Sequence, residues 1–265
     1  VVMITAAGVS KEGLRPRDRS LVRVPLFSRS KVYADAAGRL YEDAERTVMD
    51  NGRRVLADSA GVRRFDRARG RVDTIGSYRR VVRSPLLPPP ATGRKREPGP
   101  VAASRSGPVP FVSMDQWAVA PDGTIAFVHV EPYRVRFVAP SGQVREGPPI
   151  PYRPEPLTAG HKARYKTQSQ AMVLALTYTR DGQSSGGRRN PRPYVEPATW
   201  PDVLPPFLPE ALQYAPDGTL WVERTVAAGA PRRYDVIDRT GRVTRRVEVP
   251  LDTRVVGFGV RAVYL

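Results

Sequence analysis

The chain has 265 residues, of which 43 are lysine or arginine and 26 are aspartate or glutamate, so its formal net charge is +17 at pH 7. It contains no cysteine, which excludes a disulfide framework, a thiolate metal site and a cysteine nucleophile. No apolar run approaches the ~20 residues that a membrane-spanning helix requires. We therefore predict no membrane span.

The positive charge suggests an anionic partner, but its distribution argues against a nucleic-acid-binding protein. Most of the basic excess lies in residues 51–110 rather than in the regular segments that follow. Arginine heavily outnumbers lysine, as codon bias in a GC-rich genome would produce. No RNA-recognition motif, helix-turn-helix or zinc-finger spacing is present. Nucleic-acid binding is therefore not expected despite the net charge.

In chain order, the first regular segments read as hairpins. A partial hairpin is expected within residues 1–25. Residues 32–41 and residues 62–72 each alternate in polarity around a glycine, so each run predicts two antiparallel strands. The dipeptide Asn51-Gly52 lies between these two runs and is typical of one further hairpin turn.

A five-residue phrase, Ala-Pro-Asp-Gly-Thr, occurs at residues 120–124 and again at residues 215–219, each time between two β-patterned runs. A second alternating hairpin follows each copy, over residues 135–144 and 234–243. Each copy therefore predicts four strands, which is the content of one β-propeller blade. The two upstream hairpins form a third, weaker copy of the same unit.

We predict an all-β fold: a single β-propeller domain over residues 1–265, built of four-stranded blades and one inserted helix. Three blades are recognisable, with partial hairpins at residues 1–25 and 255–265, so the chain is expected to be a fragment of a larger propeller. Equivalent turn glycines lie about twice as far apart as the ~40–45 residues of an ordinary blade allow, which indicates insertions between the blades.

The insertions differ in composition. Residues 84–110 are rich in proline and arginine and are expected to form a mobile insertion. Residues 158–177 start with a threonine that can cap a helix, and the segment predicts a helical insertion, although its apolar end could instead be a strand. His161 lies in this segment and is expected to be solvated. A flexible basic loop is expected over residues 181–193.

The stretch Asp115–Gly123, followed by Glu131–Val135 and Gly147–Tyr152, resembles six-bladed, NHL-like β-propeller proteins of environmental bacteria, notably Gemmatimonadota. Three further stretches fit the same group: Trp200–Asp202, Pro205–Phe207 and Val255–Gly259. The resemblance implies the propeller fold and export or lipid anchoring, and hence a periplasmic or extracellular location. It implies no activity, because these proteins are largely uncharacterised.

One cluster of polar residues is a candidate for chemistry. His129 and Glu131 stand two apart on a predicted strand, hence on one face, and with Asp115 nearby they could approach a metal ion. Calcium bound in the channel of propeller lactonases is the precedent. The stronger alternative is structural, with His129 and Glu131 pairing with Arg134 or Arg136 in the sheet. The sequence lacks the usual nucleophile, phosphate and zinc motifs, so we assign no catalytic residue, no metal site and no cofactor.

The aromatic residues divide into two groups. Trp117, Tyr133 and Trp221 are expected to pack between blades rather than form a ligand platform. Trp200 and Phe207 lie in a proline-rich connector and are expected to be exposed. The candidate binding residues are Asp115, His129, Glu131, Tyr133, Arg134, Trp200 and Phe207.

Two functional hypotheses follow from this pattern. The first is a non-catalytic binding or scaffold propeller that holds a protein, peptide or glycan at its rim or channel mouth. The alternative is a calcium-dependent propeller hydrolase or lactonase, which needs convergent Asp, Glu and Asn side chains from several blades. Asparagine is scarce in the chain, which disfavours the alternative. Binding of a polyanion through residues 84–110 is a third possibility.

Overall fold

The structure is a computed structural model, and it describes most of the regular part of the chain. The described residues are 3–5, 8–10, 32–44, 47–50, 53–66, 68–80, 110–174, 179–180, 183–184, 194–197, 199–259 and 262–265. The predicted insertion at residues 84–110 therefore lies outside the described residues except for its last position. Most of the predicted loop at residues 181–193 lies outside them too.

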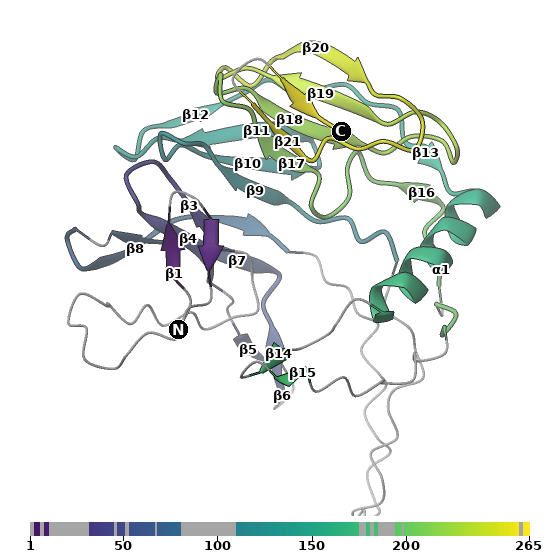
Figure 1. Ribbon diagram of the computed structural model, residues 1–265, viewed down its shortest axis with the longest axis horizontal. Helices are drawn as coiled ribbons and strands as arrows, with labels where there is room; N and C mark the ends of the chain where they lie inside the picture. Colours follow the sequence, from purple (N-terminus) through teal and green to yellow (C-terminus); the bar gives the residue numbers. More distant parts are fainter. Residues whose placement is uncertain are drawn as a thin grey trace, which may run out of the picture.

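Three four-stranded antiparallel sheets form the body of the molecule, and they follow one another in space as they do in sequence (Figure 1). The first blade contains β3 (Tyr33–Ala34), β4 (Leu40–Ala44), β7 (Ser59–Asp66) and β8 (Arg71–Arg79). The second contains β9 (Gln116–Val119), β10 (Ile125–Val130), β11 (Tyr133–Val138) and β12 (Val144–Glu146). The third contains β17 (Leu212–Tyr214), β18 (Leu220–Arg224), β19 (Arg233–Ile237) and β20 (Val243–Glu248).

This arrangement is that of an all-β partial propeller, as the sequence predicts. In each sheet the strands are paired in chain order, and the first strands β3, β9 and β17 lie next to one another. The inner edges of the three blades therefore meet, as the channel-lining strands of a propeller do.

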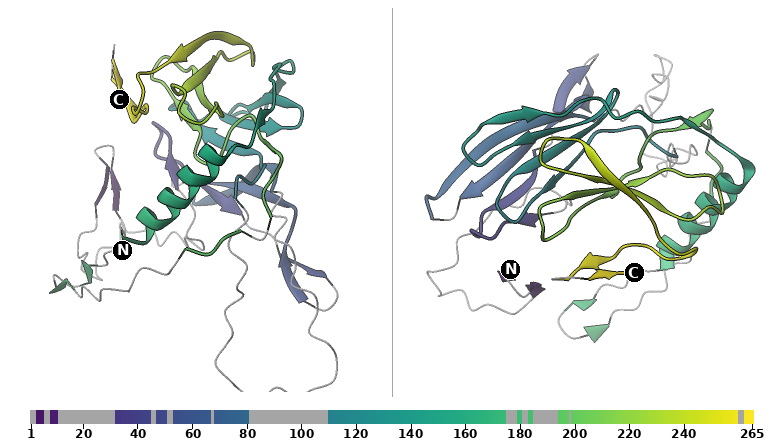
Figure 2. Two further views of the ribbon diagram at one scale, coloured as in Figure 1. Left: turned by 90° about the vertical axis from the view of Figure 1, so that its right-hand side faces the viewer. Right: turned by 90° about the horizontal axis from the view of Figure 1, so that it is seen from above.

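Five short two-stranded sheets and one helix complete the described structure. The strands pair as β1 (Met3–Thr5) with β2 (Gly8–Ser10), β5 (Thr47–Asp50) with β6 (Arg53–Leu56), β13 (Glu155–Pro156) with β16 (Val203–Leu204), β14 (Thr179–Arg180) with β15 (Gln183–Ser184), and β21 (Gly257–Phe258) with β22 (Val263–Tyr264). Helix α1 (Ala159–Leu174) confirms the helical insertion and lies at the edge of the stack of sheets (Figure 2). Strands β5 and β6 flank the predicted Asn51-Gly52 turn.

The repeated phrase forms the turn between the first two strands of its blade. In the second blade the N–H of Gly123 donates to the carbonyl of Ala120 over 2.9 Å, and the N–H of Ala120 donates to the carbonyl of Thr124 over 2.8 Å. The loop therefore holds three residues, and its glycine takes a φ of 85°. This is the form of a type I turn followed by a left-handed residue. The Asp122 carboxylate closes the turn by accepting the N–H of Thr124 over 2.9 Å.

Aromatic residues fill the spaces between blades, as predicted for Trp117 and Tyr133. Trp117 packs between the first and second blades with Tyr41 and Phe127, and Tyr133 packs between the second and third blades. Trp221 packs on the other side of the third blade, where its ring centroid lies 5.1 Å from that of Phe258 in the C-terminal hairpin. Each sheet is thus buried against its neighbour by large side chains, which supplies most of the driving force for stacking.

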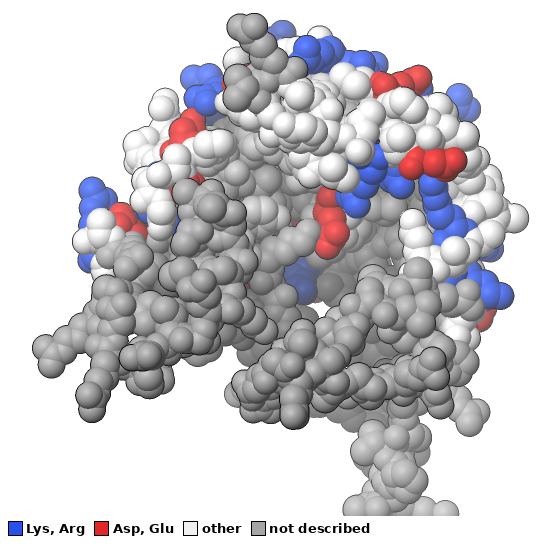
Figure 3. All heavy atoms as spheres, viewed as in Figure 1, with Lys and Arg blue, Asp and Glu red and all other residues white. Residues whose placement is uncertain are grey.

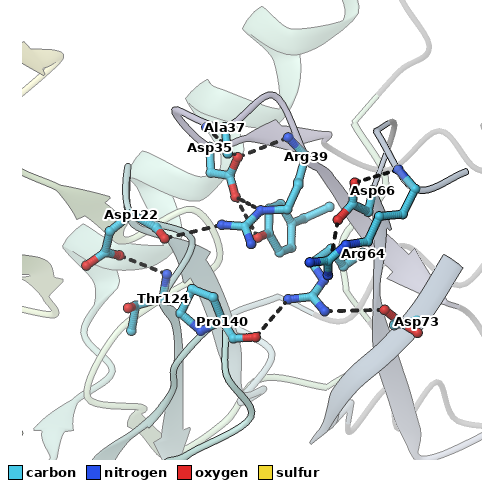
Figure 4. A network of polar contacts seen from close by, with 11 residues as sticks. Asp35, Ala37, Arg39, Arg64, Asp66, Asp73, Asp122, Thr124 and Pro140 are labelled. Carbon is cyan, nitrogen blue, oxygen red and sulfur yellow. Dashed lines mark hydrogen bonds and ion pairs between the residues drawn. The ribbon is translucent and has the colours of Figure 1, made fainter. Parts of the chain in front are cut away.

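The turn of the second blade sits directly on the first blade (Figure 4). Asp35 is buried and accepts hydrogen bonds from the Arg39 guanidinium at 2.6 Å and the Tyr41 hydroxyl at 2.8 Å. Arg39 then reaches across the interface and donates to the carbonyl of Asp122 over 3.3 Å. A Cβ added to Gly123 would lie 2.7 Å from an oxygen of Asp35, in contact with Arg39 as well. The turn glycine is therefore needed for its conformation and for the close approach of the blades.

The strand order separates two kinds of connection onto opposite faces of the propeller. Short glycine turns join the first strand to the second and the third to the fourth in every blade. The opposite face carries the connections from β4 to β7, β8 to β9, β10 to β11, β12 to β17 and β18 to β19. All the long insertions between β3 and β20 leave from this second face, which we name the long-loop face.

Replacing Gly123 by alanine is expected to destabilise the protein more than the same change at Gly142. Both glycines have φ near 85°, at 85° and 88°, but a Cβ at Gly142 would meet no atom within 4 Å. Backbone strain of about 1–3 kcal/mol applies to both, and only Gly123→Ala adds crowding against Asp35 and Arg39. Urea unfolding measures the difference. Equal losses in the two variants would show that the contact between blades at Gly123 contributes nothing.

Candidate functional site

Most of the candidate residues lie on the long-loop face around an aspartate–histidine pair, whereas Arg134 and Phe207 line neither of the clefts on that face. Asp115 precedes β9 and His129 lies near the end of β10, and their side chains meet with Nδ1 of His129 2.8 Å from Oδ2 of Asp115. Strand pairing explains the contact, since Gln116 is opposite Val128 and the next position outward brings Asp115 opposite His129. The sequence carried this signal, because the turn at residues 120–124 already sets the register of the hairpin.

Asp115 is held rigidly. Its carboxylate also accepts the backbone N–H of Val130 over 3.0 Å and that of Arg79 over 3.2 Å. Burial raises the pKa of Asp115, but the hydrogen bond from His129 and the two backbone N–H groups together lower it below its usual value. The aspartate is therefore a fixed negative charge near neutral pH, and it determines how the imidazole of His129 is oriented.

The neutral form of His129 has a defined tautomer. A carboxylate only accepts hydrogen bonds, so Nδ1 carries the proton and Nε2 keeps its lone pair. The side chain is 21% exposed, and no group in the described part of the chain hydrogen-bonds to Nε2. His129 lines a cleft of roughly 580 Å³, which we name the histidine cleft. Its other walls are formed by Ser59, Ser77, Tyr78, Arg79, Ser113, Met114, Asp115, Val130, Glu131 and Arg136.

A second, larger cleft of roughly 770 Å³ shares Ser113, Val130 and Glu131 with the first. Six prolines and four aromatic residues line it, and we name it the proline cleft. The aromatic members are Phe111, Tyr133, Tyr152 and Trp200. Because proline has no backbone N–H, this wall offers few hydrogen-bond donors and an apolar surface.

The proline cleft is bordered by a ring cluster that connects it to helix α1. Ring centroids of Phe111 and Tyr165 are 5.5 Å apart, and those of Tyr165 and Trp200 are 5.6 Å apart. The ammonium of Lys162 lies 5.2 Å from the centroid of the Trp200 ring, within the range of a cation–π contact. In the view of Figure 3, basic side chains gather over α1, whose described residues include Lys162, Arg164 and Lys166.

Tyr133 lines the proline cleft and also contacts a buried ionic network between the second and third blades. Its hydroxyl donates to Asp235 over 3.1 Å, and Asp235 also pairs with Arg224 at 2.6 Å and Arg246 at 3.2 Å. Burial, followed by the charge of Asp235, raises the pKa of Tyr133 well above its usual value. The guanidinium of Arg224 stacks 4.8 Å from the Tyr133 ring centroid. Tyr133 thus contributes a ring to the cleft wall while its hydroxyl is engaged in the interior.

His129 lies opposite Arg134 in the sheet, but neither His129 nor Glu131 forms an ion pair with Arg134 or Arg136 among the described residues. Arg134 pairs with Glu146 at 3.1 Å, since both project from neighbouring strands. Arg136 donates to the carbonyl of Ser77 over 2.8 Å. His129 instead pairs with Asp115, and Glu131 forms no ion pair within the described residues.

Two expectations about exposure are corrected. Phe207 is 1% exposed, because the connector folds back over the second and third blades and places the ring 5.7 Å from Tyr133. His161 is 6% exposed, and its Nδ1 accepts the N–H of Thr158 while its Nε2 contacts the carbonyl of Val226 at 3.0 Å. This histidine anchors the start of α1 to the third blade. Trp200 is partly buried in the wall of the proline cleft.

The described residues contain no group of three or more histidine, aspartate or glutamate side chains that could hold a metal ion. The structure therefore gives no support to a metal site formed by Asp115, His129 and Glu131. No helix in the described part of the chain is both long and apolar enough to cross a membrane.

Comparison with known proteins adds little to this description. No family model matches the chain, and no curated protein matches it. Among solved structures, the chain is similar to selenomethionine-substituted virginiamycin B lyase from Staphylococcus aureus, with 14% sequence identity and a TM-score of 0.29. The alignment covers 98% of this chain and 67% of that chain. A structural similarity this weak supports no conclusion about function.

The two histidines are expected to adopt opposite neutral tautomers. His129 donates from Nδ1 to the Asp115 carboxylate, whereas Nε2 of His161 must carry the proton because a carbonyl faces it. Long-range ¹H–¹⁵N spectra of the imidazoles at about pH 8.5, where free histidine is neutral, distinguish the two patterns. Asp115→Asn is expected to change the His129 pattern alone. Identical tautomers for both residues would contradict the assignment.

Removing the buried carboxylate of Asp235 is expected to be costly. Asp235→Asn leaves the guanidinium of Arg224, which is 11% exposed, without its charged partner, and the loss of one member of a buried pair costs about 3–5 kcal/mol. Glu248→Gln, which breaks an exposed pair with Arg233, is the matched control, with an expected loss of about 1 kcal/mol or less. Denaturant unfolding compares them, and similar losses would rule out a central role for Asp235.

Proposed function

We propose that the protein is a binding propeller that holds an apolar segment of a peptide or protein in the proline cleft on the long-loop face. The observation that carries this proposal is the lining of the cleft, in which six prolines and four aromatic residues surround a space of roughly 770 Å³. Aromatic and proline surfaces bind ligands through rigid apolar contacts that cost little conformational entropy.

The chemistry of the wall favours peptide side chains over a glycan. The polar side chains of the lining are Ser113, Glu131 and Thr199, with the hydroxyl of Tyr152, because the Tyr133 hydroxyl and the Trp200 indole N–H are bonded to Asp235 and Glu196. These groups offer few partners for the many hydroxyl groups of a sugar. Apolar side chains need no hydrogen-bond partners from the cleft wall. The cleft therefore suits an extended segment with apolar residues better than it suits a carbohydrate.

The position of the cleft supports the same function. Propellers present rigid sheets with variable connections on one face, and binding residues are concentrated on such connections. The cleft is built from the connection before β9, the turn between β10 and β11, and the long connection that leads to β17. We also propose that the protein belongs to the six-bladed, NHL-like group and that it has a periplasmic or extracellular location. The resemblance of the sequence motifs supports both parts of this proposal.

Peptides selected from a random display library on the whole chain are expected to bind through Trp200. Trp200→Ala is expected to weaken their binding by at least about tenfold, because truncation of a partly buried tryptophan in a binding cleft has the energetics of a hot spot. Fluorescence anisotropy with a labelled peptide measures the change. Tyr264→Ser, which removes an exposed ring outside the cleft, is the control. Equal affinity for the Trp200 variant and the control would refute the site.

A further inference from the structure

The histidine cleft holds a group that peptide binding does not use. Asp115 is fixed by two backbone N–H groups and holds Nδ1 of His129, so that the lone pair on Nε2 is left unengaged by the described residues. His161 shows the contrasting case, with both of its ring nitrogens engaged and the side chain buried. An oriented imidazole with a free lone pair in a cleft is the geometry of a general base.

The charges around His129 define what the base could act on. Two acidic residues, Asp115 and Glu131, and two arginines, Arg79 and Arg136, line the same cleft together with Tyr78. Arg136 is held in place by the carbonyl of Ser77 and by the ring of Phe127, whose centroid lies 4.9 Å away. A guanidinium near the base can stabilise negative charge that develops on a carbonyl oxygen.

We propose that His129 is the general base of a hydrolytic site for carboxylic esters that carry an apolar group. Nε2 of His129 takes a proton from water as the water oxygen bonds to the acyl carbon. The tetrahedral intermediate then breaks its bond to the alcohol oxygen, which leaves with the proton from His129. The products are the carboxylic acid and the alcohol, and the histidine returns to its starting state with no other reactant consumed.

The shared wall between the two clefts accounts for the apolar part of the substrate. Ser113, Val130 and Glu131 belong to both linings, so a molecule bound at His129 can extend directly into the proline cleft. Esters suit an imidazole base with a guanidinium neighbour because their alcohol leaves more readily than the amine of an amide. This activity is additional to peptide binding and does not depend on it.

The test uses the whole chain with p-nitrophenyl butyrate and p-nitrophenyl acetate. The wild-type protein is expected to hydrolyse both above the buffer rate, with a lower KM for the butyrate, and with a rate that rises with pH through one ionisation. His129→Gln is expected to lower kcat/KM by about 100-fold or more and to abolish that ionisation. Asp115→Asn is expected to lower kcat, because the tautomer is no longer held. Tyr264→Ser is expected to behave as wild type.

Three results would overturn the proposal. The first is hydrolysis no faster than buffer, and the second is a His129→Gln variant, folded by circular dichroism, that keeps the wild-type rate and pH profile. The third is a rate that is unchanged in D₂O, which would show nucleophilic attack by the imidazole instead of proton removal from water. Equal KM values for the two esters would overturn the assignment of an apolar substrate. Peptide binding is measured separately with Trp200→Ala, so failure of either proposal leaves the other distinguishable.

Discussion

The close approach of backbone to backbone between adjacent blades is the constraint on which the rest of the structure depends. Gly147, which follows the second blade, faces Gly241 in a turn of the third, and a Cβ on either one would lie within about 2.6 Å of the Cα of the other. At Gly76 of the first blade the neighbour is a side chain instead, since an added Cβ would lie 2.8 Å from the ring of Phe127 in the second blade. Blades that stack this closely hold their first strands side by side. The spacing in turn positions the pairs that cross between blades, including Tyr133 with Asp235.

This stacking divides the molecule into a structural face and a variable face. On the first, the turns have nearly constant length, and those at Gly123 and Gly241 pack directly against the neighbouring blade, which restricts changes there. On the long-loop face, the ends of β10 and β11 are fixed while the connections between blades can vary in length without disturbing the sheets. The two clefts form where fixed strand ends meet these connections. The physical separation explains why the candidate residues and the repeated phrase lie on opposite faces.

The blades could be predicted from the sequence because their turns are encoded locally. Each turn needs a residue with positive φ, which glycine supplies, and in every blade turn except the one at Gly142 an aspartate precedes that glycine within five positions of the chain. Residue spacing grouped Asp115 with His129 and Glu131 as a possible metal site, whereas the register of the hairpin pairs His129 with Asp115, 14 residues away. The burial of Phe207 and His161 could not be predicted, because each is covered by a segment distant in sequence. The composition of a segment indicates whether it forms a connector or a helix, but it does not indicate which other segment of the chain packs against it.

Part of the high arginine content of the chain has a structural role at the junctions between blades. Several arginines bridge adjacent blades by donating to backbone carbonyl groups: Arg39 to Asp122, Arg64 to Pro140, and Arg136 to Ser77. A guanidinium can do this while it also pairs with a carboxylate or stacks on a ring, because its five donors form a rigid planar fork. Lysine, with a flexible point charge, cannot replace it in both roles at once. At these three contacts arginine therefore serves the joining of the sheets, whatever the chain binds.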